Sequence, residues 1–492
     1  MSTKTRFDIK NPRNLTMLVD FYELTMANGY LNNGVENTIA YFDMFFRRIP
    51  DNGGYCIMAG VEQLIEYLTN LTFTKEDIEY LRNKNLFSDK FLNYLENFKF
   101  ECDVWAIPEG TPVFPGEPLI TVRGPIMQSQ FVETMILLTI NHQTLIATKA
   151  ARICEAAGNI PVMEFGSRRA QGYDGALYGA RAAIIGGCSS TACTMADELF
   201  NVPVTGTMAH SWIQLFDSEY EAFKAWAKTY PDNTVLLVDT YNVLKSGIPN
   251  AIKVFDEVLK PMGKRPKAIR IDSGDIAYLS NESRKMLDEA GYNDVKITIS
   301  NSLDEFIIKA VLENGAKIDS FGVGERLITA KSEPVFGGVY KLVAIEKDGK
   351  IVPKIKISEN VEKITNPGFK SLYRVYDLDT DKAIADLISL NGEVFDYNKP
   401  LELFHPNYTW KKKKVKNYKI KELMVKIIDK GVCVYKSPSV MEIKKFSIKE
   451  REYLWSEIRR LQNPHQYYVD LSKDLWNLKE FLLHEYSSMY EE

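Results

Sequence analysis

Hydrophobic and polar positions along the first 150 residues follow two kinds of pattern. Residues 16–30 carry apolar side chains at helical spacing, whereas residues 38–48 alternate as a strand does. Residues 75–98 return to helical spacing, and prolines and glycines divide residues 104–124 into short strands. A long helical pattern runs from Gln128 to Ala157 and ends at Gly158. The sequence therefore predicts a mixed α+β domain over residues 1–150.

From residue 160 the pattern changes to short β-rich runs, each followed by a segment of helical length. The runs are PVMEFG, GCSS, VPVTGT, TVLLVDT, AIRIDSGD, VKITISNS and IDSFGVG. Such alternation is typical of parallel strands joined by crossover helices. Polar residues and glycines gather after each strand, which favours a closed barrel over an open sheet. We expect an α/β fold with an irregular TIM-like (β/α) barrel over residues 151–345.

Beyond residue 345 the pattern becomes a mixed segment followed by a charged helical tail. We expect residues 346–492 to form a mainly helical C-terminal extension, part of which completes the N-terminal domain. The lysine run at 411–414 has no glycine loop or interleaved aromatic residues beside it, so we interpret it as a solvated surface loop.

Composition and charge narrow the classes of protein and of partner. The 61 basic and 65 acidic residues of this 492-residue chain give a net charge of -4, which excludes a nucleic-acid-binding character. The apolar run at 134–140 is too short to span a membrane, and residues 1–14 lack the apolar core of a signal peptide. Six cysteines without CxxC spacing indicate neither a zinc site nor a disulfide framework. We expect a cytoplasmic protein.

The ends of the predicted strands carry the candidate chemistry. Each residue alone has an ordinary structural interpretation: His210 as a core histidine, Asp239, Asp272 and Asp275 as helix caps, and the glycines as turn formers. The residues in question are Arg168, Arg169, Ser189, Ser190, Thr207, His210, Asp239, Arg270, Asp272, Asp275, Ser300, Asn301, Gly322, Gly324, Gly337 and Gly338.

Together these residues indicate a phosphorylated ligand with magnesium. Arginines and glycine loops bind phosphate through forked donors and backbone N–H groups, and carboxylates among them suit Mg²⁺. Adjacent arginines at 168 and 169 also allow one to bind the ligand while its neighbour forms a structural ion pair. The chain has no GxxxxGK[ST] loop, no strand–GxGxxG–helix and no lysine at the end of a mid-barrel strand.

Six ordered stretches carry a resemblance to a known family. MEFGSRRAQG, GTMAHSW, LLVDTYN, RIDSGD, FGVGERL and GGVYKLV resemble the motif series of the nicotinate phosphoribosyltransferases. The resemblance covers roughly residues 15–345 and implies a type II phosphoribosyltransferase-like barrel. It also implies a reaction of NAD biosynthesis, classed with the ligases: nicotinate displaces pyrophosphate from 5-phosphoribosyl 1-pyrophosphate (PRPP). The step requires Mg²⁺ and is coupled to ATP hydrolysis through a phosphorylated histidine.

The motifs assign roles residue by residue. His210 resembles the histidine that accepts the phosphoryl group from ATP, and Thr207 and Arg270 match positions that contact nicotinate. Phe165 resembles the aromatic residue on one face of the pyridine ring. Tyr22 matches one that reaches the other face from a second subunit, which implies a homodimer with shared active sites.

The remaining assignments concern PRPP. Asp239 and Asp272 match catalytic and Mg²⁺-binding positions, and Arg168 and Arg169 lie beside the phosphates in the family. Glu325 follows the glycine motif directly, and we leave it outside the site because a carboxylate repels phosphate. The backbone donors for the 5′-phosphate would be Gly322, Gly324, Gly337 and Gly338.

Three rival functions remain open at this stage. A nicotinamide phosphoribosyltransferase would carry an aspartate in the GCSST segment, where this chain has Ser189 and Ser190, and Ser190 is therefore assigned to nicotinate. A non-catalytic phosphometabolite-binding barrel would not need a phosphoryl-accepting histidine. An aldolase or isomerase acting on phosphate esters would turn over without ATP or PRPP.

Overall fold

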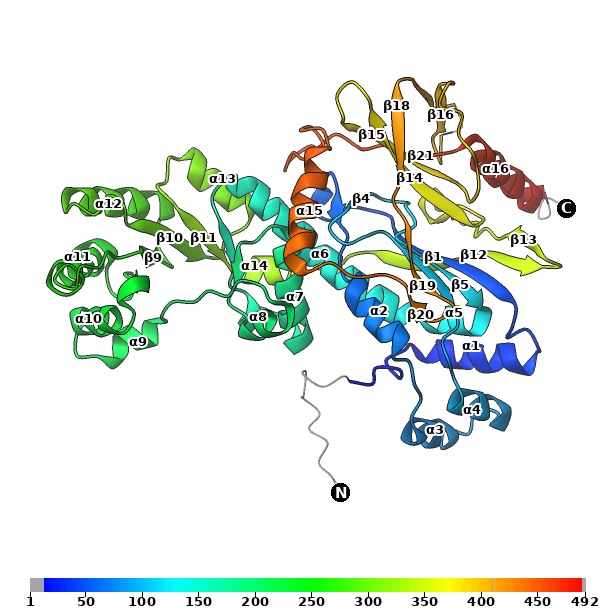
Figure 1. Cartoon of the computed structure of the whole chain (residues 1–492), viewed down its shortest axis with the longest axis horizontal. Coiled ribbons are helices and arrows are strands. Elements are labelled where there is room, and N and C mark those ends of the chain that lie inside the picture. Colours follow the sequence, from blue (N-terminus) through cyan, green and yellow to red (C-terminus); the bar gives the residue numbers. More distant parts are fainter. Residues whose placement is uncertain (1–12, 409, 489–492) are drawn as a thin grey trace. The chain divides into compact units, whose positions relative to one another are not determined.

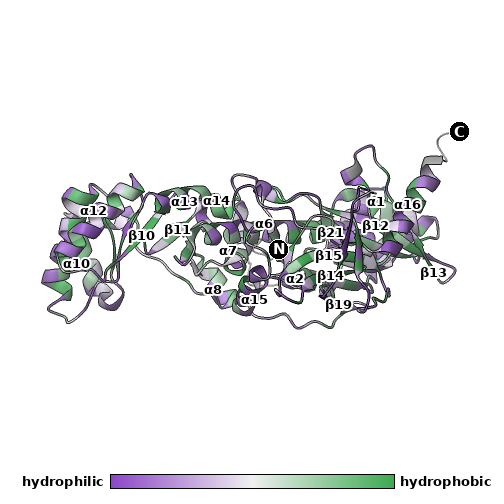
Figure 2. Cartoon of the chain, turned by 90° about the horizontal axis from the view of Figure 1, so that it is seen from above, coloured by the Kyte–Doolittle hydropathy of each residue, from purple (hydrophilic) through white to green (hydrophobic). Residues whose placement is uncertain are grey.

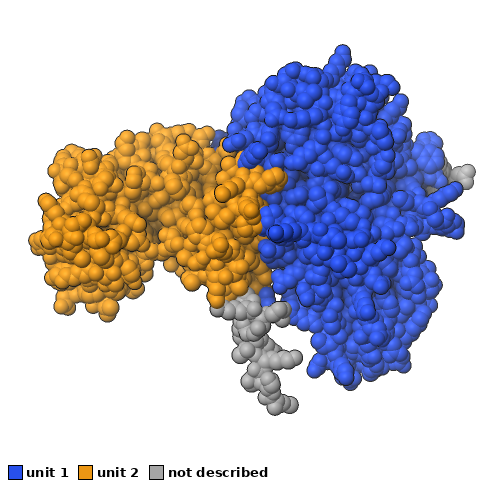
Figure 3. Space-filling view, in the orientation of Figure 1, with its two compact units in different colours: residues 1–144, 335–438, 449–492 blue, residues 145–334, 439–448 orange. Residues whose placement is uncertain are grey.

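The computed structural model describes residues 13–408 and 410–488, and these form two units (Figure 3). Unit 1 comprises residues 1–144, 335–438 and 449–492, and unit 2 comprises residues 145–334 and 439–448. Residues 1–12, which carry most of the segment tested for a signal peptide, lie outside the described residues. In the described ranges no helix has both the length and the apolar content needed to cross a membrane.

A parallel six-stranded sheet forms the centre of unit 2 (Figure 1). Its strands lie in the order β7-β6-β11-β10-β9-β8, and every neighbouring pair is parallel. The side chains of Ile269, Ile299 and Phe321 are fully buried in it. The strands are β6 (Val162–Glu164), β7 (Ser190–Thr191), β8 (Val235–Leu237), β9 (Ala268–Ile271), β10 (Lys296–Asn301) and β11 (Ser320–Val323).

Helices alternate with these strands, as the sequence pattern predicted. Figure 2 shows that α10 and α12 carry both hydrophobic and hydrophilic residues, as expected of helices with one face buried. The helices of this unit are the C-terminal part of α6 (Glu133–Ala157), then α7 (Gly172–Gly186), α8 (Thr194–Phe200), α9 (His210–Leu215), α10 (Glu219–Thr229), α11 (Ile248–Val254), α12 (Ile276–Glu289), α13 (Glu305–Glu313) and α14 (Glu325–Ile328), with part of α15 (Val440–Glu452).

One predicted strand, at residues 202–207, is reduced to an isolated bridge between Val204 and Thr191. Pro203 has no N–H to donate, so only its carbonyl and the N–H of Thr205 bond to Thr191. Hydrogen-bonded neighbours therefore follow one another from Val204 through β7, β6, β11, β10 and β9 to β8. No ladder joins β8 back to Val204 within the described residues, and the closed barrel stays a prediction.

Unit 1 contains an antiparallel sheet of seven strands in the order β13-β12-β1-β5-β3-β19-β20 and a second sheet in the order β17-β16-β21-β15-β14-β18. The first sheet contains β1 (Ile39–Phe46), β3 (Asp103–Ala106), β5 (Ile120–Pro125), β12 (Gly338–Lys347), β13 (Lys350–Pro353), β19 (Val425–Asp429) and β20 (Val432–Cys433). A small pair consists of β2 (Cys56–Ile57) and β4 (Pro112–Val113). The helices are α1 (Phe21–Asn32), α2 (Val61–Thr69), α3 (Lys75–Arg82), α4 (Asp89–Glu96), α5 (Ile126–Phe131) and α16 (Lys473–Ser488).

The predicted domain boundaries at residues 150 and 345 differ from the observed divisions at 144 and 334. Strand β12 pairs antiparallel with β1 through Phe42 and Leu342, so residues 338–345 belong to unit 1 rather than to the barrel. This pairing joins segments about 300 residues apart, which local sequence patterns do not reveal. Residues beyond 345 contribute to both units and form no separate domain.

The expectation of a mainly helical C-terminal region is wrong. Most of its elements are strands, and their apolar side chains form a core with Val375, Leu387 and Leu403 at its centre. The second sheet comprises β14 (Lys370–Asp377), β15 (Ala383–Leu390), β16 (Leu401–Phe404), β17 (Lys412–Val415), β18 (Tyr418–Glu422) and β21 (Val469–Leu471).

The lysine run is likewise a strand, β17, and not a surface loop. Its lysines cover aromatic rings: the ammonium of Lys412 lies 4.8 Å from the Phe404 ring, and that of Lys413 lies 4.5 Å from the Tyr468 ring. Long aliphatic stems let charged residues cover an apolar surface, which is why the hydrophobic alternation of this strand is hidden in the sequence. The six cysteines form no disulfide bond within the described residues.

Candidate active site

The carboxyl ends of the unit 2 strands bring most of the predicted residues to one edge of the sheet. Arg270 lies at the centre of this group and is mostly buried, with its side chain 14% exposed. Its Nε donates to Ser300 Oγ at 2.7 Å, and its Nη1 donates to Thr207 Oγ1 at 2.9 Å and to the carbonyl of Met208 at 3.3 Å. Its Nη2 donates to Asp272 Oδ1 at 3.0 Å. Four of the five guanidinium N–H groups are therefore used within the protein, and one on Nη2 remains.

Phe165 lies directly beside this arginine. The guanidinium carbon of Arg270 is 5.7 Å from the centre of the Phe165 ring, which is within the range of a cation–π contact. The backbone N–H of Phe165 donates to Val323 O at 2.8 Å, which holds the residue at the end of β6. An aromatic face and a guanidinium thus come together, although 105 residues separate them in the chain.

Asp239 and Asp272 form the acidic part of the site. Oδ2 of Asp239 accepts from the backbone N–H of Asp272 at 3.0 Å and from Ser273 Oγ at 2.6 Å. Neither carboxylate caps a helix: Asn242 caps the turn after β8, and only Asp275 caps α12, by accepting from the N–H of Tyr278 at 2.9 Å. The capping interpretation therefore holds for Asp275 and is wrong for the other two.

His210 lies at the start of α9 with its side chain 41% exposed, so it is not a buried core histidine. Its Nδ1 lies 3.1 Å from Thr240 Oγ1, and its Nε2 lies 3.9 Å from Asp272 Oδ2. Thr240 was not among the predicted residues. Its position directly after Asp239 in the LLVDTYN stretch is the signal that could have identified it.

Glu164 is a second residue that the sequence prediction missed. Its side chain is fully buried at the end of β6, and its carboxylate accepts from the N–H of Gly166 and from Thr191 Oγ1, the latter at 2.6 Å. Burial raises the pKa of this carboxyl. Glu164 therefore fixes the turn between Phe165 and the two arginines and ties it to β7.

Arg168 and Arg169 lie on the short 3₁₀ turn η2 (Ser167–Arg169), and both are exposed. Neither guanidinium group forms an ion pair or a hydrogen bond with any residue in the described part of the chain. The described residues therefore contain no acidic partner in an ion pair with either arginine. Glu325, which was left out of the site, forms an ion pair with Lys331 at 2.6 Å, and this lysine together with the charge of Arg169 lowers the pKa of its carboxyl.

The two glycines of the FGVG motif make room for this turn. A Cβ atom on Gly322 would lie 2.5 Å from the Phe165 ring, and one on Gly324 would lie 3.3 Å from Phe165 O. Gly166 is equally constrained, because a Cβ there would lie 2.6 Å from Ile328. These glycines therefore let the two loops pack closely, which any side chain would prevent.

Ser190 lies in β7, opposite Met163 of β6, and is only 8% exposed.

Three of the predicted site residues, Tyr22, Gly337 and Gly338, belong to unit 1. Tyr22 lies on α1 and is 44% exposed, and burial together with Glu133 raises the pKa of its hydroxyl. Gly337 has open space beside it, whereas a Cβ on Gly338 would strike Asn141 Oδ1. The N–H of Gly338 donates to Phe336 O at 2.9 Å.

The acidic pair also fits a magnesium ion. Oδ1 of Asp239 is buried and lacks a hydrogen-bond partner among the described residues, which is costly for a carboxylate oxygen unless a ligand satisfies it. The described residues contain no cluster of three or more His, Cys, Asp or Glu side chains that could hold a metal alone. Mg²⁺ ordinarily binds through one or two carboxylates together with substrate phosphates, so two are sufficient.

Comparisons with known proteins agree in pointing to one family. The nicotinate phosphoribosyltransferase (NAPRTase) N-terminal domain model matches residues 17–141, and the nicotinate phosphoribosyltransferase C-terminal domain model matches residues 369–479. A nicotinate phosphoribosyltransferase of Bacillus subtilis is 44% identical over 97% of both chains. One of Caenorhabditis elegans is 34% identical over 94% of this chain and 92% of its own.

Solved structures extend the comparison to the fold. The human nicotinic acid phosphoribosyltransferase superposes with a TM-score of 0.84 and 28% identity, covering 94% of this chain and 99% of its own. A nicotinate-nucleotide pyrophosphorylase of Pyrococcus furiosus shares the α/β fold, with a TM-score of 0.68 and 23% identity over 91% of this chain and 98% of its own. At these identities and coverages, the chain belongs to the nicotinate phosphoribosyltransferase family of enzymes.

Proposed function

We propose that this protein forms nicotinate mononucleotide and pyrophosphate from nicotinate and PRPP, coupled to ATP hydrolysis through phosphorylation of His210. The observation that carries the proposal is the position of Arg270. One guanidinium group contacts an aromatic face, the Thr207 hydroxyl and Asp272 of the acidic pair, so a planar anionic ring bound there would adjoin a magnesium–phosphate site.

For nicotinate, we propose that the pyridine ring lies against Phe165 and that its carboxylate accepts from Arg270 and Thr207. Arg270 offers its one remaining N–H, and the carboxylate could gain a second by displacing Asp272 from Nη2. Ser190 would line the same site from β7. A serine places no negative charge against the substrate carboxylate, which favours the acid over the amide.

For PRPP, the guanidinium groups of Arg168 and Arg169 are exposed and form no hydrogen bond with another described residue, so they would provide donors for its phosphates. Glu164 holds their turn, and fixed cations near the departing pyrophosphate stabilise the charge that develops there. Asp239 and Asp272 would hold Mg²⁺, which neutralises phosphate charge when it is bound. Backbone donors near Gly322 and Gly324 would complete the 5′-phosphate site.

For ATP, the surroundings of His210 select one ring nitrogen. If Nδ1–H donates to Thr240 Oγ1, Nε2 carries the lone pair and is the nucleophile. Nε2 then forms a bond to the γ-phosphorus while the bond from that phosphorus to the bridging oxygen breaks and ADP leaves. In this tautomer Thr240 would determine which nitrogen is phosphorylated.

The proposal includes a homodimer in the cytoplasm, with an irregular barrel as its catalytic domain. Helix α1 supports the dimer, because it buries Leu24 and Leu31 on one side and leaves Phe21, Tyr22 and Met26 from 37% to 45% exposed. A helix that is apolar on both sides is typical of one covered by a partner. Tyr22 would then reach the nicotinate ring of the second subunit.

The central test measures pyrophosphate release with PRPP and nicotinate, nicotinamide or quinolinate, each with and without ATP. We expect pyrophosphate to be released from PRPP with nicotinate but not with nicotinamide or quinolinate, and to be released faster when ATP is present. Turnover of a phosphate ester without ATP or PRPP would support an aldolase or isomerase instead. Pyrophosphate release with nicotinamide and not with nicotinate would reverse the substrate assignment.

A separate test addresses the phosphohistidine. Incubation with γ-labelled ATP should leave acid-labile, base-stable label on the parent protein and on His405→Ala, but none on His210→Ala. An unlabelled parent, or equal label on His210→Ala, would remove the coupling from the proposal.

A further inference from the structure

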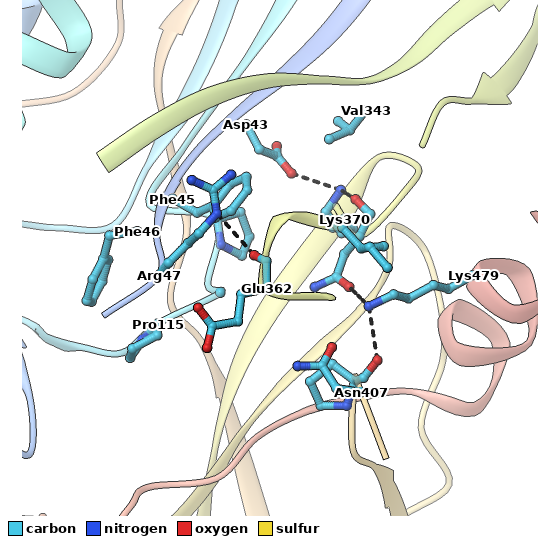
Figure 4. A pocket seen from close by; sticks show the side chains of 15 residues that line it. Asp43, Phe45, Phe46, Arg47, Pro115, Val343, Glu362, Lys370, Asn407 and Lys479 are labelled. Carbon is cyan, nitrogen blue, oxygen red and sulfur yellow. Dashed lines mark hydrogen bonds and ion pairs between the residues drawn. The ribbon is translucent and has the colours of Figure 1, made fainter. Parts of the chain in front are cut away.

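Unit 1 contains a cavity of about 140 Å³ that the proposed reaction does not use (Figure 4). It lies between the end of β1, the turn before β5, the segment leading to β14, the loop after β16 and helix α16. Asp43, Arg47, Glu362, Lys370 and Lys479 are the charged residues in its lining. Cations therefore outnumber carboxylates around this cavity.

Lys479 is the unusual member of this set. Its side chain is only 3% exposed, and its ammonium donates to Asn366 Oδ1 and to Pro406 O, each at 3.0 Å. Both acceptors are uncharged, and no carboxylate of the described residues forms an ion pair with Lys479. An ammonium has three N–H groups, so one donor of Lys479 lacks a hydrogen-bond partner among the described residues. Burial lowers the pKa of Lys479 to about 8, and the negative charge of Glu480 on the same helix offsets this effect only in part.

The other lysine of the cavity is balanced. Lys370 is buried against Asp43, with Nζ and Oδ2 2.8 Å apart, and it also donates to the carbonyl oxygens of Asn366 and Gly368. Thr121 Oγ1 donates to the second oxygen of Asp43 at 2.7 Å. The charge of Asp43 is thereby used, and it does not compensate Lys479.

Arg47 adds a second source of donors. Its Nε donates to the carbonyl oxygen of Glu362 at 3.0 Å, which leaves both terminal amino groups without a partner among the described residues. The Glu362 carboxylate is exposed, so water screens its charge. The side-chain amide of Asn407 lines the same space.

The chemistry of the lining selects the ligand. A cation would be repelled by Lys479, and an apolar molecule would leave the buried ammonium unpaired. The volume is well below the range of about 300–1,000 Å³ that encloses drug-sized ligands, so a nucleotide is too large. We propose that this cavity binds a small free oxyanion of the size of inorganic phosphate, held by Lys479 and Arg47.

The test is calorimetric titration of the full-length protein with sodium sulfate at pH 8, and with inorganic phosphate in parallel. Lys479→Met removes the charge at similar length, and Lys473→Met removes an exposed charge from the same helix as a matched control. The parent and Lys473→Met should bind sulfate with equal affinity, whereas Lys479→Met should lose this site or bind at least tenfold more weakly. Equal binding by Lys479→Met would overturn the proposal.

Proton uptake provides an independent readout, because an anion favours the protonated form of Lys479. Titrations in two buffers of different ionisation enthalpy should show protons taken up on sulfate binding by the parent and not by Lys479→Met. Asp43, Lys370, Arg47 and Glu362 face the same cavity and are unchanged in both proteins. Equal uptake by the two would contradict the assignment. If Lys479→Met fails to fold, Asn407→Asp should weaken sulfate binding by adding a negative charge, and unchanged binding would again refute it.

Discussion

Arg270 offers the sharpest test of the candidate active site. Replacing it with lysine keeps a positive charge beside Asp272 but removes the fork that bonds to Ser300, Thr207 and Met208 at once. A lysine cannot donate from fixed positions in one plane, so it loses at least one charge-assisted hydrogen bond to the nicotinate carboxylate. Such a bond contributes about 1.5–3 kcal/mol.

This loss corresponds to a change of about 10- to 150-fold in affinity. We expect the KM for nicotinate to rise by that factor in Arg270→Lys, with the KM for PRPP within about twofold of the parent. The preference for nicotinate over nicotinamide should shrink as well, because only the acid uses the guanidinium charge. Steady-state pyrophosphate release measures all three quantities.

Arg265→Lys is the matched control. Arg265 lies just before the same strand, but its side chain is 53% exposed and forms an ion pair with the similarly exposed Asp294. Exposed pairs contribute little, so its kinetic constants should stay within about twofold of the parent. If Arg270→Lys left the nicotinate KM unchanged and raised that for PRPP, Arg270 would belong to the phosphate site and the reasoning would fail.

Three further predictions follow from named residues. Ser190→Asp should raise the KM for nicotinate more than that for PRPP, because it places a carboxylate against the substrate anion, and equal nicotinate constants in mutant and parent would sink this idea. Tyr22→Ala and His210→Ala should each be inactive as pure dimers yet recover about half the parent activity per mixed dimer, whereas no recovery would mean that each chain builds its own pocket. Burial raises the pKa of Glu23 to about 8, so the folded chain keeps a proton that the unfolded chain loses near pH 4.5. The contribution of Glu23 to the free energy of unfolding therefore falls as the pH rises from 4.5 to about 8. Between pH 5.5 and 8.5 the Tm of Glu23→Gln should therefore fall less than the Tm of the parent or of the control Glu79→Gln, which changes an exposed residue. Parallel Tm curves for the three proteins would contradict the assignment to Glu23.

The course of the chain through unit 2 could be predicted because its signals are local. Short β-rich runs, turn glycines and helical spacing lie within 10 to 20 residues of one another, so β6, β9, β10 and β11 were placed correctly. Asp275 is equally local, since a helix cap acts on an N–H three residues away. The resemblance of six motifs then identified the family.

The sequence could not show which residues meet. Arg270 bonds to groups 2, 30 and 63 residues away, and the use of four of its five N–H groups by protein acceptors appears only in the folded chain. Glu164 was overlooked because its partner, Thr191, is 27 residues away and belongs to a strand of two residues. Asp239 accepts from the N–H of Asp272, directly after β9, instead of capping a helix, and this contact depends on the parallel pairing of β8 with β9.

The limit of prediction from local sequence patterns is clearest in unit 1. One of its sheets pairs strands about 300 residues apart, and the other uses lysine stems to cover aromatic rings, so neither the topology nor the hydrophobic alternation is visible locally. Lys479 is an ordinary helical lysine in the sequence and becomes a buried, unbalanced charge only when α16 packs against Asn366 and Pro406. Local sequence signals identified the family, most of the order of elements in unit 2 and the kinds of side chain at the strand ends, because these depend on near neighbours. The partners, the burial and the charge balance of those side chains were decided by the tertiary structure, because they depend on contacts between distant segments.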